Sequence, residues 1–120
     1  MDGRVQDPVN TFLKKHFDAT YVDVVTEPGP NKILADGARP ELLESVLARV
    51  RISVEKHQSV GLAVVGHHDC AGNPSGPEEQ TAHTEAAVAR LREAFPGLPV
   101  LGLWVDASWD VTDLDPSGQP

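Results

Sequence analysis

Apolar residues three and four positions apart mark three segments of the chain as amphipathic helices. These segments are residues 8–17, 40–57 and 78–95. The first two begin with proline, whose missing N–H is harmless in the first turn of a helix, and the third is stopped by Pro96 and Gly97. Each segment is therefore predicted to be a helix that packs one apolar stripe against its neighbours.

Three shorter runs have the composition of β-strands, at residues 21–25, 62–65 and 100–105. The first is rich in β-branched and aromatic residues and is followed by a Glu-Pro-Gly-Pro turn. The second is continuously apolar between two glycines, which is typical of a strand buried on both faces of a parallel sheet. Because helices and strands alternate, we predict an α/β fold in which a parallel β-sheet is flanked by helices.

The two ends of the chain complete this layout. Residues 1–7 are predicted to be a loop of the kind that follows a strand, yet no strand precedes them, so the sheet is expected to lack its first strand. Residues 106–120 are rich in Asp, Ser, Gly and Pro and are expected to form a loosely ordered tail. A chain of 120 residues is the size of one domain, so we expect a single domain over residues 1–120.

Charge and hydropathy narrow the classes of partner. The formal net charge of −8 repels phosphate backbones and anionic lipids, so nucleic acid is not expected as a partner. The longest apolar run, residues 60–66, is far shorter than the roughly 20 residues of a membrane-spanning helix, and no membrane association is expected. Met1 to Arg4 do not resemble a secretory signal, which favours a cytoplasmic location.

The residues best suited to metal binding or catalysis directly follow the second predicted strand. His67 and Cys70 are three positions apart on a tight loop, at the carboxyl edge where open α/β sheets bind ligands. An imidazole and a thiolate at this spacing can both reach one Zn²⁺. A buried, inert cysteine beside an exposed histidine is the competing interpretation, and the spacing alone slightly favours it.

Other interpretations of these residues are weaker. A phosphate-binding CxxxxxR loop around Cys70 is excluded because Gly76 stands where the arginine is required. A redox role for the thiol has no second cysteine to support it. His68 is expected to face solvent, and Asp69 to cap the following turn. Surface positions are expected for the helical histidines and core or interface positions for the tryptophans, namely His16, His57, His83, Trp104 and Trp109.

Residues 64–72, VVGHHDCAG, resemble the second zinc-binding segment of the β-class carbonic anhydrases, in which a strand ends in GHxDCG. Met1 to Arg4, MDGR, resemble the last four residues of the CxDSR motif of that family, with Gly3 in place of serine. Residues 18–30 and 101–111 are similar to two further stretches of the family, although Thr26 and Glu27 replace the Arg and Asn of its RNAG motif.

The resemblance implies a function and a set of site residues. His67 and Cys70 would be zinc ligands, and Asp2 and Arg4 a dyad in which the arginine holds the aspartate and the aspartate accepts a hydrogen bond from zinc-bound hydroxide. The activity implied is that of a lyase, the reversible hydration of CO₂ to bicarbonate, in a homodimer or higher homo-oligomer. CS₂ and COS are open as alternative substrates, since the same zinc chemistry would act on them.

One departure from the family pattern affects the metal site. The first cysteine ligand of the family would fall one residue before Met1. The absence implies either a reading frame that begins upstream, which we favour, or a natural truncation in which the metal site is damaged and the activity impaired. Asp2, His68 or water could otherwise complete the zinc coordination, with Asp2 the best candidate. The alternative function is a non-catalytic metal-binding or interaction domain descended from the family.

Overall fold

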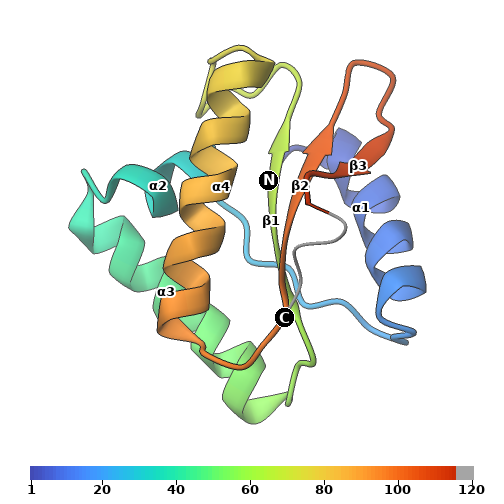
Figure 1. Ribbon diagram of the computed structural model, residues 1–120, viewed down its shortest axis with the longest axis vertical. Helices are drawn as coiled ribbons and strands as arrows, with labels where there is room; N and C mark the ends of the chain where they lie inside the picture. Colours follow the sequence, from blue (N-terminus) through green and yellow to red (C-terminus); the bar gives the residue numbers. More distant parts are fainter. Residues whose placement is uncertain (116–120) are drawn as a thin grey trace.

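The computed structural model describes residues 1–115. Within them, four helices surround three strands (Figure 1). In chain order the elements are α1 (Gly3–His16), α2 (Pro30–Asp36), α3 (Pro40–Lys56), β1 (Leu62–His67), α4 (Pro77–Ala94), β2 (Val100–Val105) and β3 (Val111–Asp113).

The strands form one sheet in the order β1-β2-β3. β1 and β2 are parallel, with Leu62 opposite Val100 and His67 opposite Val105. β3 is antiparallel to β2 and begins opposite Val105, so the sheet is mixed. The predicted α/β class and the parallel pairing of the two central strands are confirmed. β3 lies within the stretch expected to be a loose tail, of which residues 116–120 fall outside the described part of the chain.

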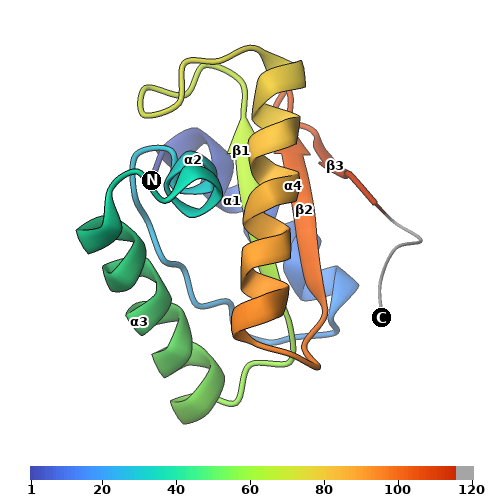
Figure 2. The ribbon, with the colours of Figure 1, turned by 60° about the vertical axis from the view of Figure 1, so that its left-hand side comes forward.

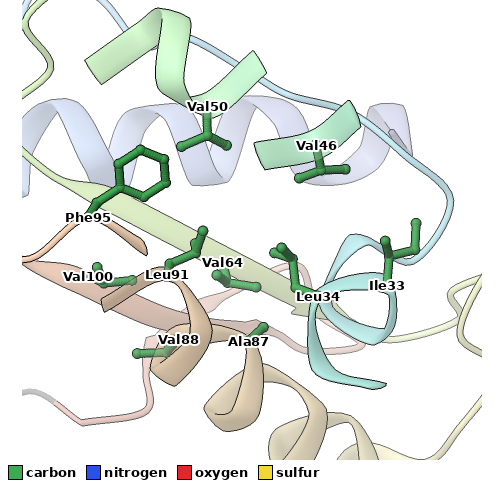
Figure 3. Packing of buried hydrophobic residues seen from close by; sticks show 10 residues of the cluster. All are labelled: Ile33, Leu34, Val46, Val50, Val64, Ala87, Val88, Leu91, Phe95 and Val100. Carbon is green, nitrogen blue, oxygen red and sulfur yellow. The ribbon is translucent and has the colours of Figure 1, made fainter. Parts of the chain in front are cut away.

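Helices cover both faces of the sheet (Figure 2). The alternation of side chains along β2 explains the two layers: Leu101, Leu103 and Val105 pack with α1, whereas Val100 packs with α2, α3 and α4. The second of these cores is the larger (Figure 3). Its buried residues are Ile33, Leu34, Val46, Val50, Val64, Ala87, Val88, Leu91, Phe95 and Val100.

The predictions for residues 40–57, 78–95 and 100–105 are confirmed as α3, α4 and β2. The first helix starts earlier than predicted, because the Asp2 side chain accepts a hydrogen bond from the Arg4 N–H and caps α1. The prediction that residues 1–7 form a loop is therefore wrong. α2 was not predicted. It is only seven residues long and follows Gly29, which adopts a left-handed conformation with φ of 64°.

The predicted strand at residues 21–25 is wrong, because these residues pair with no other strand within residues 1–115. Their β-branched side chains favour extended backbone, but a strand also needs a neighbour with which to exchange hydrogen bonds. Tyr21 and Val24 are 86% and 48% exposed, in keeping with a segment that lacks such a neighbour. None of the helices formed by residues 1–115 has the length and apolarity needed to cross a membrane.

Candidate metal centre

His67 is the last residue of β1 and is buried at the carboxyl end of the sheet. Its Nδ1 lies 2.7 Å from the main-chain carbonyl of His68, to which it can donate a hydrogen bond. In that tautomer Nε2 keeps a free lone pair. Histidines that bind metals commonly have their second ring nitrogen fixed in this way by a carbonyl or carboxylate. The hydrogen bond thus leaves Nε2 of His67 available as a nitrogen donor.

Cys70 lies three residues beyond, in the loop after β1, and is also buried. This loop passes so close to the turn before α2 that neither side has room for a side chain. A Cβ on Gly72 would lie 2.7 Å from the Gly29 nitrogen, and one on Gly29 would lie 2.7 Å from the carbonyl carbon of Gly72. The close contact of these two glycines fixes the loop that carries the thiol.

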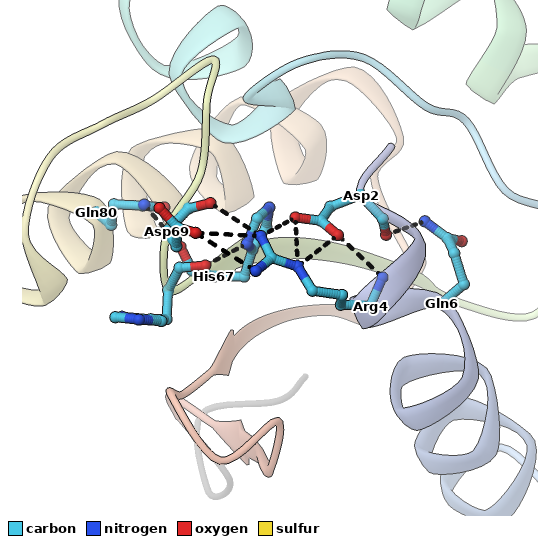
Figure 4. A network of polar contacts seen from close by, with 7 residues as sticks. Asp2, Arg4, Gln6, His67, Asp69 and Gln80 are labelled. Carbon is cyan, nitrogen blue, oxygen red and sulfur yellow. Dashed lines mark hydrogen bonds and ion pairs between the residues drawn. The ribbon is translucent and has the colours of Figure 1, made fainter.

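Asp2 and Arg4 form a tight ion pair at the start of α1 (Figure 4). Arg4 Nη2 lies 2.6 Å from Asp2 Oδ2, and Arg4 Nε donates to Oδ1 at 3.0 Å. These side-chain hydrogen bonds, together with the Arg4 main-chain N–H and the charge of the Arg4 guanidinium, hold the pKa of Asp2 well below its usual range. The same pairing raises the pKa of Arg4. Asp2 is therefore an ionised acceptor.

Arg4 also connects α1 to the loop after β1. Its Nη1 lies 3.4 Å from Asp69 Oδ2, and its guanidinium lies 4.5 Å from the ring centroid of Trp109. Asp69, which was expected to cap the following turn, instead faces Arg4, and exposed His68 makes an edge contact with the same indole. Trp109 thus supports the site, a role that the sequence did not suggest.

The structure brings Asp2, Arg4 and His67 together, with Cys70 in the adjoining loop. The nitrogen and sulfur donors of His67 and Cys70 suit Zn²⁺, and each is buried as a structural or catalytic ligand would be. Residues 1–115 contain no group of three or more His, Cys, Asp or Glu side chains placed to hold a metal ion. By donor chemistry, His67 and Cys70 would supply two of the four ligands of a tetrahedral zinc ion. Both carboxylate oxygens of Asp2 are engaged by Arg4.

Comparison with known families matches residues 1–115 to the family described as "Putative carbonic anhydrase". The chain belongs to this family. No curated protein and no solved structure matches it. The family model covers all the described residues, including the MDGR and GHHDC segments. It confirms the resemblance to the family.

In this carbonic anhydrase family member, a buried polar network supports the loop that follows β1. Asn31 donates from Nδ2 to Gln80 at 3.1 Å and to Thr84 at 3.2 Å. Asn73 donates to Asn31, and its Nδ2 lies 3.0 Å from His83 Nδ1. His83, expected on the surface, is partly buried here.

The sequence analysis missed this network, although one signal was present. Gln80 and Thr84 fall in phase with Ala87, Val88 and Leu91 on the buried side of α4. Polar residues on an apolar stripe are buried, and a buried polar side chain needs partners. The pattern could have marked Gln80 and Thr84 as network members, but it could not have named Asn31 as their partner.

Proposed function

We propose that this chain forms the catalytic core of a zinc-dependent lyase that interconverts CO₂ and bicarbonate, with His67 and Cys70 as metal ligands. The observation that carries the proposal is the orientation of His67: Nδ1 is fixed by the His68 carbonyl, and the imidazole lies near the Asp2–Arg4 pair. Zn²⁺ held there would lower the pKa of a coordinated water to about 7 and so supply a nucleophile.

The chain's own residues would orient that nucleophile. Asp2 is ionised throughout the neutral range because Arg4 holds its pKa low, so it can accept a hydrogen bond but cannot donate one. Arg4 in turn is held by Asp69 and Trp109 and cannot swing freely. A carboxylate fixed in this manner would accept a hydrogen bond from the reacting water. It would thereby orient the water so that a lone pair of the water oxygen points toward the carbon of CO₂.

The substrate and assembly are part of the same proposal. CO₂ is small and uncharged, so the net charge of −8 does not oppose its approach. COS and CS₂ are linear molecules that the same chemistry would attack, and a comparison of the three rates would rank them. The family resemblance also supports a homodimer, which light scattering of the purified protein tests. A cytoplasmic location is the remaining part of the proposal, and fractionation of cells tests it.

A second candidate function is a metal-binding or interaction domain without catalysis. It is favoured by the donor set, because residues 1–115 supply only the His67 and Cys70 pair instead of a complete ligand shell. Two ligands bind zinc more weakly than three, and Asp2 could complete the shell only by leaving Arg4.

Two measurements on the same samples separate these candidates: bound zinc by elemental analysis and CO₂ hydration by stopped flow. We expect stoichiometric zinc and hydration in the wild type, and loss of both in His67→Ala and Cys70→Ala. His16→Ala is the control, because His16 is exposed at the far end of α1. Zinc without hydration would favour the non-catalytic domain. Zinc retained in Cys70→Ala would refute the ligand assignment.

A further inference from the structure

The turn between β2 and β3 has a tryptophan where the backbone favours glycine. The Trp109 N–H donates to the Asp106 carbonyl at 2.9 Å, and the Asp106 N–H donates to the Asp110 carbonyl at 3.1 Å, so residues 107–109 form the tip of the hairpin. Trp109 is the last of the three and has a φ of 63°. Hairpins of this length commonly place glycine at such a left-handed position. A bulky side chain there is strained, because its Cβ crowds the backbone.

The turn is well determined without the Trp109 side chain. Asp106 Oδ1 accepts hydrogen bonds from the N–H groups of Ser108 at 2.9 Å and Asp110 at 3.0 Å. Aspartate is favoured at the first position of a turn because it can cap the following backbone in this way. The tryptophan is therefore not needed to form the turn, and its strained position has another cause.

The indole of Trp109 lies against Arg4. Arg4 Cζ is 4.5 Å from the ring centroid, within the range in which a π face attracts a cation. His68 meets the same indole edge-on, with ring centroids 6.4 Å apart, and the His68 N–H donates to the Val105 carbonyl at 2.9 Å. The indole is thus held both by the turn and by the loop after β1.

Apolar packing alone does not account for the tryptophan. Trp109 packs against the core beneath α1, but Val105 and Val111 contact the same core. These two valines pair with each other in the strands on either side of the turn, where the backbone is unstrained. An apolar contact between the hairpin and α1 therefore needs no left-handed residue.

Residues with strained backbones gather around Arg4. Within residues 1–115, four residues other than glycine have a positive φ, namely Asp18, Gln58, Asp69 and Trp109. Two of these four contact Arg4, Trp109 through its indole and Asp69 through Oδ2 at 3.4 Å. Strained residues persist where the surrounding contacts fix them, and they concentrate at functional sites. The strain thus indicates that the hairpin turn serves Arg4.

Arg4 needs such support because its ion pair with Asp2 lies at the surface. The Arg4 side chain is 47% exposed and that of Asp2 22%. Exposed ion pairs contribute little on their own, since two mobile side chains must be ordered in water. An aromatic face attracts a guanidinium without using any of its N–H groups. The contact with Trp109 therefore adds to the Asp2 hydrogen bonds and does not compete with them.

We propose that Trp109 is a positioning residue of the candidate site. The hairpin turn carries a strained backbone, and the indole placed there holds the guanidinium of Arg4. Arg4 in turn holds the Asp2 carboxylate in one orientation. The contact with Arg4 does not depend on zinc. Its consequence for turnover rests on the proposed lyase function, in which Asp2 orients the reacting water.

Four variants of the full chain test the proposal. Trp109→Phe keeps a π face, whereas Trp109→Leu has an apolar side chain without one, and both keep the left-handed backbone. Trp109→Gly removes the indole and the strain together. Trp104→Leu is the control for loss of a tryptophan, because Trp104 alternates along β2 with Leu103 and Val105 and so points away from α1.

The first measurement is the exchange of the Arg4 Nε–H with water, followed by NMR on the metal-free protein. We expect exchange to quicken about two- to fivefold in Trp109→Leu and Trp109→Gly, the effect of losing a cation–π contact at a partly exposed site. Trp109→Phe and Trp104→Leu should stay near the wild-type rate. Equal exchange in Trp109→Leu and the wild type would overturn the proposal. If Trp109→Leu does not fold, Trp109→Gly decides in its place.

The second measurement is kcat for CO₂ hydration, with bound zinc determined on the same samples. We expect Trp109→Leu to lower kcat by about two- to fivefold at unchanged zinc, and Trp109→Phe to retain it. In an Asp2→Asn background, Trp109→Leu should lower kcat no further, because the indole acts only through Arg4 and Asp2. Equal losses in the two backgrounds would overturn the proposal. A wild type without hydration would refute the lyase function, and Arg4 exchange would then decide the role of Trp109.

Discussion

Gln80 donates a hydrogen bond from Nε2 to the main-chain carbonyl of His67 at 2.9 Å. The same amide group donates to the carbonyl of Asn73 at 3.0 Å. One buried side chain of α4 therefore connects the end of β1 to Asn73, within the loop that carries Cys70. Gly66 makes this possible, because a Cβ there would lie 3.0 Å or less from the side chains of Gln80, Asn31 and Thr84.

Replacement of Gln80 tests this connection. We expect Gln80→Leu to lower the free energy of unfolding by about 1–3 kcal/mol, since two buried carbonyls and the Asn31 amide lose a partner. Urea denaturation measures the loss. Glu85→Leu, at an exposed position on the same helix, should change stability by less than about 0.5 kcal/mol. A similar loss in both variants would show that Gln80 has no special structural role.

The Asp2–Arg4 pair should affect turnover more than metal content. We expect Asp2→Asn to lower kcat for CO₂ hydration by about 100-fold, because the amide can donate a hydrogen bond where only an acceptor is wanted. Bound zinc should be unchanged, because Asp2 is held by Arg4 and is not needed as a ligand. Stopped-flow rates and elemental analysis of the same samples give both quantities. A parallel fall in zinc and rate would mean that Asp2 binds the metal.

The contact between Gly72 and the turn before α2 gives a prediction about stability. A side chain at Gly72 would overlap the backbone of Pro28 and Gly29, so we expect Gly72→Ser to cost about 1–3 kcal/mol or more. Gly76→Ser is the matched control, because a Cβ there meets nothing within 4 Å and serine is a preferred residue at the start of a helix. Thermal denaturation of both variants makes the comparison. Equal melting temperatures would contradict the close contact.

Much of the fold was predictable because its signals are local. The apolar stripes of α3 and α4 and the composition of β2 each lie within one segment, and the structure confirms them. α2 escaped prediction because its start depends on the left-handed Gly29, whose place is set by contact with Gly72. Residues 21–25 show the reverse error, since their composition favours a strand but the pairing partner is not supplied by residues 1–115.

The candidate site likewise has a part that local sequence signals reveal and a part that depends on long-range contacts. His67, Cys70, Asp2 and Arg4 were identified from two short motifs, and the structure places them around the carboxyl end of β1. The residues that hold the site in place were not identifiable, because their contacts are distant in sequence. Asn31 meets Gln80 across 49 positions, and Arg4 meets Asp69 across 65. No local pattern encodes such a pair, whereas the folded chain brings both together.

Asp23 provides a pH-dependent prediction away from the site. Its Oδ2 accepts a hydrogen bond from Ser53 Oγ and contacts His57 Nδ1, both at 2.6 Å, and so fixes residues 21–25 to the end of α3. The hydrogen bond from Ser53, followed by the contact with His57, lowers the pKa of Asp23 in the folded protein. A lowered folded-state pKa contributes stability above the ordinary carboxyl pKa of about 4, and this contribution disappears as the pH falls through the folded-state pKa.

We therefore expect Asp23→Asn to be less stable than the wild type at pH 7 and to approach it as the pH falls below about 4. Urea denaturation at a series of pH values between 2 and 7 measures the difference. Asp18→Asn is the control, because Asp18 is an exposed acid in the same connection, and its left-handed backbone, with φ of 50°, suits asparagine. Parallel pH profiles for Asp23→Asn and the wild type would show that the Asp23 carboxylate does not stabilise the position of residues 21–25.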